Sequence, residues 1–89
     1  MSVEKLCELI NRYREYFKSI GVEKVELSDD MKGFMDDKVL AHCNSILDGL
    51  EKVLEEGNRE SVFGYMRFIQ GCLFANGFFS LKELNEHNS

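Results

Sequence analysis

Two helical patterns meet at one glycine in residues 37–76, which read DKVLAHCNSILDGLEKVLEEGNRESVFGYMRFIQGCLFAN. Before Gly57, apolar residues recur at steps of three and four from Val39 to Val53, the spacing of one face of an α-helix. Asn58, a favoured N-cap residue, follows the glycine directly. Two helices joined by so short a turn pack antiparallel. The stretch therefore predicts a helical hairpin, with helices at about 37–56 and 59–76.

The residues outside the hairpin predict two further helices. Ser2 is a plausible N-cap and Gly21 a helix-ending glycine, and apolar residues between them again step by three and four, at Val3, Leu6, Ile10, Tyr13, Phe17 and Ile20. Ser80 and Glu83 have the spacing of a capping box that opens a short helix. We expect an all-α, helix-hairpin bundle with three main helices (about 3–20, 37–56 and 59–76), a short C-terminal helix (about 81–87) and an ordered connector at 22–35.

Composition limits the class of protein. The chain has 89 residues, of which 44% are hydrophobic and 30% charged, and this is typical of a single globular domain over residues 1–89 rather than of disorder. No apolar run approaches the roughly 18 residues of a membrane span, and no signal-peptide pattern is present. Three widely spaced cysteines indicate reduced thiols in a cytoplasmic protein: Cys7, Cys43 and Cys72. The core of so small a domain is modest, which favours a homodimer.

The net charge of −5 is uneven along the chain. Residues 21–57 hold ten acidic and four basic side chains, so they carry −6, while the C-terminal third is neutral. The absence of a basic stripe argues against direct nucleic-acid binding, because phosphate contacts dominate that affinity. The segment contains two acidic doublets, Asp29-Asp30 and Asp36-Asp37. They form either a candidate patch for a basic partner or a solvated loop whose aspartates cap helices.

No residue pattern supports catalysis or metal binding. His42 and Cys43 are adjacent, so on a helix they point about 100° apart and share no ligand face. The acidic doublets lack the alternate spacing of a calcium loop, and no phosphate-binding glycine loop, nucleophile elbow or zinc spacing is present. We therefore expect no catalytic residue, no metal and no cofactor, and interpret the protein as a non-enzyme.

The helix at 59–76 is apolar nearly all round and is expected to be buried on most sides. Its polar residues mark the side that faces outward, and two phenylalanines fall on that side, which gives a candidate interface of Phe63, Arg67, Gln70 and Phe74. Either the chain itself covers these phenylalanines, or a subunit or partner does. Arg67 and Gln70 either hydrogen-bond across that interface or face solvent. The small residues Gly64, Gly71 and Ala75 line one face and predict close packing against another backbone.

The C-terminal half resembles small, uncharacterised helical accessory proteins of tailed phages and prophages. The resemblance covers about residues 40–88 and rests on Glu56-Gly57-Asn58-Arg59-Glu60, Met66-Arg67-Phe68-Ile69-Gln70-Gly71-Cys72-Leu73-Phe74, Gly77-Phe78-Phe79-Ser80-Leu81-Lys82-Glu83-Leu84 and His87-Asn88. It implies a viral accessory origin and a host-cell cytoplasm. It transfers no catalytic residues, since the family carries no established activity.

Two functions are compatible with these features. The first is a small non-enzymatic protein–protein interaction module, homodimeric, that acts on a host or phage protein. The second is an acidic decoy that occupies the nucleic-acid-binding surface of a defence or transcription protein, with the acidic doublets as its binding patch; binding of that kind weakens steeply with salt.

Overall fold

The computed structural model describes residues 1–28 and 37–89, without the side chain of Asp37, and contains four helices in these ranges. They are α1 (Val3–Ser19), α2 (Asp37–Glu55), α3 (Arg59–Ala75) and α4 (Leu81–Asn88). The described residues contain no strand. The predicted all-α class, with three main helices and a short C-terminal one, is confirmed, and the predicted bounds hold to within one residue at each end.

Local capping chemistry sets the ends of the helices. The Ser2 hydroxyl accepts the Lys5 N–H at 3.1 Å, and the Asn58 side chain accepts the Ser61 N–H at 3.2 Å. Ser80 and Glu83 form the predicted capping box, with both reciprocal hydrogen bonds present. The chain leaves α1, α2 and α3 through a glycine with positive φ in each case: Gly21, Gly57 and Gly77.

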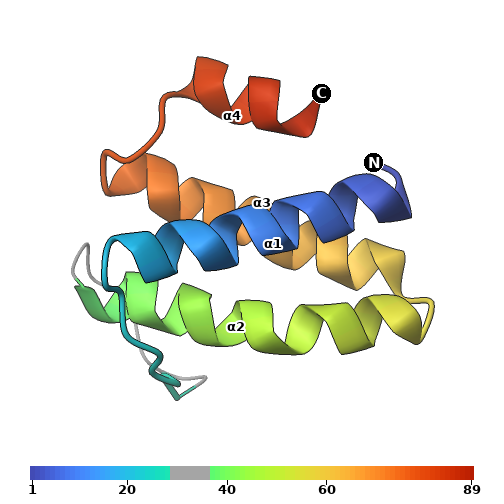
Figure 1. Cartoon of the computed structure of the whole chain (residues 1–89), viewed down its shortest axis with the longest axis horizontal. Coiled ribbons are helices and arrows are strands. Elements are labelled where there is room, and N and C mark those ends of the chain that lie inside the picture. Colours follow the sequence, from blue (N-terminus) through green and yellow to red (C-terminus); the bar gives the residue numbers. More distant parts are fainter. Residues whose placement is uncertain (29–36) are drawn as a thin grey trace.

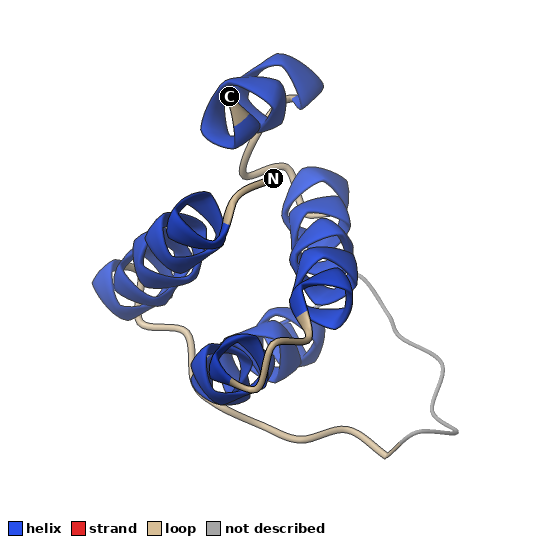
Figure 2. Ribbon diagram, turned by 90° about the vertical axis from the view of Figure 1, so that its right-hand side faces the viewer, coloured by secondary structure: helices blue, strands red, loops and turns tan. Residues whose placement is uncertain are grey.

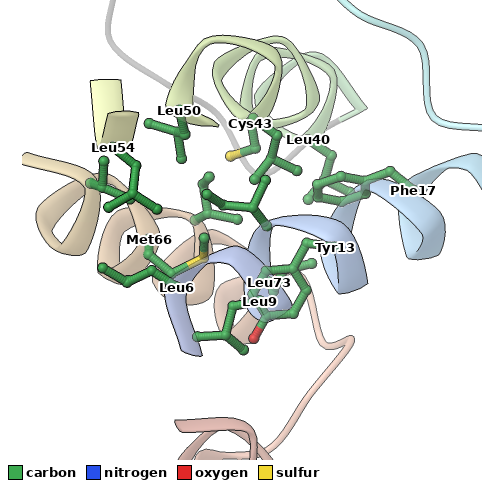
Figure 3. Packing of buried hydrophobic residues seen from close by; sticks show 14 residues of the cluster. Leu6, Leu9, Tyr13, Phe17, Leu40, Cys43, Leu50, Leu54, Met66 and Leu73 are labelled. Atoms are coloured by element: carbon green, nitrogen blue, oxygen red, sulfur yellow. The ribbon is translucent and has the colours of Figure 1, made fainter. Parts of the chain in front are cut away.

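The three long helices surround one core (Figures 1 and 2). α2 and α3 form the antiparallel hairpin, α1 packs against both, and α4 lies over α1 on the side away from α2. Figure 3 shows the buried side chains that converge from the three helices, including Leu6 and Phe17 of α1, Leu40 and Leu50 of α2, and Met66 and Leu73 of α3. None of the described helices is long and apolar enough to cross a membrane.

The first part of the connector is tied to α2. The Asn44 amide donates to the Val22 carbonyl at 3.1 Å, and the Leu27 N–H donates to Nδ1 of His42 at 3.1 Å. His42 therefore has a structural role. The aspartates of the candidate acidic patch at positions 29, 30 and 36, and the expected N-cap at position 36, lie outside the described residues. Asp37 is the first residue of α2.

One expectation for α3 is wrong. The helix is not buried on most sides: it buries one face, made of Val62, Met66, Ile69, Gln70 and Leu73, because only two long helices lie beside it. Gly64, Gly71 and Ala75 are exposed, and apart from the neighbouring residues and the backbone of α3 itself, no described atom lies within 4 Å of a Cβ built on either glycine. Among residues 1–28 and 37–89 no second backbone packs closely on these glycines, and close packing against another chain stays a prediction.

Substitution of two glycines by alanine should change the stability of the protein in opposite directions. Gly49 lies inside α2 with open space around it, so Gly49→Ala should stabilise the protein by up to about 1 kcal/mol through helix propensity. Gly57 has φ +86°, so Gly57→Ala should destabilise it by about 1–2 kcal/mol. Urea unfolding measures both free energies, and a stabilising Gly57→Ala would contradict this account of the turn.

Candidate interaction surface

The outer face of α3 carries a group of large apolar side chains that the fold leaves uncovered. Phe63 is 40% exposed, Tyr65 48%, Phe68 51% and Phe74 47%. The guanidinium of Arg67 lies 5.9 Å from the centre of the Phe63 ring, within range of a cation–π contact. Of the two possibilities for Phe63 and Phe74, the structure excludes full cover by the described part of the chain.

Gly64 and Gly71 occupy the middle of this outer face. At 100° per residue, both project between the edge that carries Phe63 and Phe74 and the edge that carries Phe68. A glycine inside an exposed helix costs about 1 kcal/mol relative to alanine. No contact within the described chain requires either glycine, so their small size serves the fold in no visible way.

A groove runs along one edge of the outer face, between α2 and α3. Its volume is about 450 Å³, and it is lined by His42, Ile46, Ser61, Gly64, Tyr65 and Phe68. Gly64 has no side chain to fill it, and the two aromatic rings come from the half-exposed group on α3. The outer face thus offers both protruding rings and a concavity that could receive one.

Gln70 does not belong to this surface, which corrects the candidate interface. Its side chain is only 3% exposed and lies on the inner side of α3. The Gln70 amide donates to the Tyr13 hydroxyl at 3.0 Å and to Oδ1 of Asn88 at 2.7 Å, and its carbonyl accepts from the Asn88 amide at 3.1 Å. A polar side chain was assigned to the solvent side, but these partners satisfy it inside the fold.

The Tyr13 hydroxyl links this glutamine to a buried histidine. The oxygen lies 2.8 Å from Nδ1 of His87 and shares a hydrogen bond with it. With the imidazole proton on Nε2, the hydroxyl accepts from Gln70 and donates to Nδ1, so that both lone pair and proton have partners. In Figure 3 the hydroxyl points out of the core on the side away from α2, and the hydrogen bond joins α1 to α4. The group of Tyr13, Gln70, His87 and Asn88, here called the buried polar cluster, has no counterpart in the sequence predictions.

Burial explains the titration of the cluster. It raises the pKa of Tyr13, and it lowers the pKa of His87. The positive charges of Arg12 and Lys5 lower the His87 pKa further, while Glu83 and Glu86 act in the opposite direction. No buried side-chain nitrogen or oxygen of the described residues lacks a hydrogen-bond partner, so the cluster is a satisfied structural network.

Part of the negative charge of residues 21–57 is neutralised at the junction of α1 and α2. Arg14 forms ion pairs with Glu51 at 3.1 Å and with Asp48 at 3.7 Å, and Lys24 pairs with Asp48 at 3.0 Å. Among the described residues, no group of three or more His, Cys, Asp or Glu side chains is placed to hold a metal. The expectations of no metal, no cofactor and no catalytic residue remain predictions.

Comparison of this chain with models of known protein families, with curated proteins and with solved structures finds no match.

Removal of one hydroxyl tests the buried polar cluster. Tyr13→Phe keeps the ring in the core but leaves the His87 imidazole without its donor and removes one acceptor from Gln70, so it should lower the free energy of unfolding by about 1–3 kcal/mol. Tyr65→Phe is the matched control on the exposed face and should change stability by less than about 0.5 kcal/mol. Equal effects of the two substitutions in urea unfolding would contradict the assignment.

The lowered pKa of His87 predicts a pH dependence of stability. Below the ordinary histidine value of about 6.5, the unfolded chain takes up a proton that the folded chain resists. The stabilisation is therefore complete above about pH 6.5 and is lost as the pH falls through the folded value. His87→Gln removes this titration and should flatten the curve between about pH 7 and 5.5 in urea unfolding; parallel curves for the two proteins would show that His87 is not responsible.

Proposed function

We propose that this protein is a small non-enzymatic protein–protein interaction module, and that the outer face of α3 is its docking surface. The observation that carries the proposal is the group of four half-exposed aromatic rings on one helix of an otherwise well-packed bundle. The largest apolar patch on a soluble monomer is about 300–600 Å² and is often functional, and the exposed rings of α3 form a surface of that order. Aromatic residues and arginine are also the types enriched at the centres of protein interfaces, and Arg67 lies among the rings.

The area of the face is compatible with a homodimer. At about 200 Å² for each aromatic side chain, the exposed fractions correspond to roughly 400 Å² of ring surface per copy. Two copies therefore contribute about 800 Å² from the rings alone, close to the roughly 1,000 Å² expected of a specific interface. Gly64, Gly71 and Ala75 would supply further area and would allow two helices to approach closely.

Charge opposes contact between two such faces only weakly. The charged side chains of α3 are Arg59, Glu60 and Arg67, so this helix carries +1 while the whole chain carries −5. The small net charge of α3 therefore opposes self-association less than the charge of the whole chain would.

The resemblance to phage and prophage accessory proteins supports a location in the host-cell cytoplasm. It also supports a host or phage protein as the partner. Three free cysteines are compatible with a reducing compartment. The alternative of an acidic decoy rests on aspartates at positions 29–37, whose side chains are outside the described part of the chain. No described feature favours it over the aromatic face.

A paired substitution on the outer face tests the proposal. Phe68→Ser with Phe74→Ser removes two exposed rings without opening the core, so the free energy of unfolding of the monomer should change little. Light scattering coupled to size-exclusion chromatography should show the wild type at twice 10.3 kDa. The double variant should be monomeric, with dimer affinity reduced by about 30-fold or more, as expected for the loss of a hot spot. Leu81→Ser is the matched control, because Leu81 is an exposed apolar residue on α4 rather than on α3.

Two outcomes would contradict the proposal in different ways. A wild type that is monomeric at high micromolar concentration removes the homodimer. Capture of partner proteins from a host lysate by wild type and double variant then tests the docking surface itself: equal recovery of every partner by both proteins would reject the outer face of α3 as the interaction site.

A further inference from the structure

Two cysteines face each other across the hairpin. Cys43 lies 14 residues before Gly57 on α2, and Cys72 lies 15 residues after it on α3, so the antiparallel packing brings them to the same level. Cys43 is completely buried, and its sulfur points from α2 into the core (Figure 3). Cys72 is partly buried and packs against the same core cluster. The third cysteine, Cys7, lies on α1.

The two thiols are close enough for each to shift the pKa of the other. The interaction with Cys43 lowers the pKa of Cys72 to about 7, although burial opposes the change. The interaction with Cys72, together with burial, raises the pKa of Cys43. Cys72 therefore holds the more reactive sulfur, because the thiolate is the nucleophile and Cys72 is also the one that solvent can reach. A low-pKa accessible cysteine beside a second thiol is the arrangement of a redox-sensitive pair.

We propose that Cys43 and Cys72 are an oxidative modification site that closes to a disulfide between α2 and α3 on exposure to a peroxide. This site is independent of the docking surface proposed above. Neither sulfur is needed for the aromatic contacts of the outer face, and Cys43 lies buried on the inner side of the hairpin.

The reaction has two steps. The Cys72 thiolate attacks one oxygen of the peroxide, the O–O bond breaks, and the second oxygen leaves with a proton as water or an alcohol; Cys72 becomes a sulfenic acid, and the peroxide is reduced by two electrons. The Cys43 sulfur then attacks the Cys72 sulfur, the S–O bond breaks, and hydroxide leaves with the Cys43 proton as water. Buried Cys43 meets the oxidised sulfur directly, which limits further oxidation of Cys72 by a second peroxide.

The cross-link constrains the unfolded chain. A disulfide from α2 to α3 closes a loop that contains the whole hairpin turn, so it reduces the conformational freedom of the unfolded state. The oxidised protein should therefore melt at a higher temperature than the reduced protein. A dithiol reductant reverses the change by thiol–disulfide exchange.

Mass spectrometry of the full chain treated with hydrogen peroxide tests the proposal. The wild type should lose two hydrogens, keep a single thiol that iodoacetamide can alkylate, and yield a non-reduced peptide that joins residues of α2 and α3. Cys72→Ser should abolish the link. Cys7→Ser is the matched control and should form the link as the wild type does. In Cys43→Ala, Cys72 should stop at the sulfenic acid, which a dimedone-type probe traps.

The wild type alone decides the outcome if a variant fails to fold. A link that contains Cys7, a link between two chains, or conversion of Cys72 to a sulfinic acid with Cys43 still free would overturn the proposal. The rate at which iodoacetamide alkylates Cys72 provides a second measurement, with an expected inflection near pH 7. These readouts do not involve dimerisation, so they fail or succeed separately from the docking surface.

Discussion

A helix in a three-helix bundle can bury only the side that faces its two neighbours, and this constraint governs α3. Its inner side is filled by Val62, Met66, Ile69 and Leu73, which meet residues of α1 and α2. The apolar side chains on its other side have no fourth long helix to cover them, because α4 is only eight residues long and packs against α1. The exposed rings of α3 are thus the direct result of an apolar helix in a bundle too small to enclose it.

The position of α4 depends on a different kind of contact. A helix of eight residues is unstable by itself, so it needs its cap and its docking side chains. Leu84 is the one fully apolar buried residue that α4 supplies, and the rest of its attachment comes from His87 and Asn88 in the buried polar cluster. Phe79, just before α4, packs on His87 with ring centroids 4.8 Å apart. Directional hydrogen bonds thus fix a segment for which little apolar area is available.

Local features of the fold could be predicted from the sequence, and long-range ones could not. Helix bounds and caps depend on neighbours within four residues, so Ser80, Glu83 and Gly57 identify them directly. Gln70 could not be placed in this way, since its partners lie 57 and 18 residues away on other helices. Tyr65 and Phe68 are apolar and the sequence pattern predicts their burial, yet both are half-exposed. Three long helices cover only part of the surface of each helix, so some apolar side chains of α3 remain outside.

The hydrogen bond from Tyr13 to His87 spans 74 residues of sequence. The α2–α3 hairpin, in contrast, closes over a turn of a few residues, and contacts of that kind form early because little chain entropy is lost. α4 should accordingly be the last helix to settle on the bundle and the first to leave it. Its departure opens the cluster around Tyr13 while the core between α1, α2 and α3 stays closed. Of the four helices, α4 is therefore expected to open at the lowest free energy, and its amide hydrogens should exchange faster than those of α1, α2 and α3.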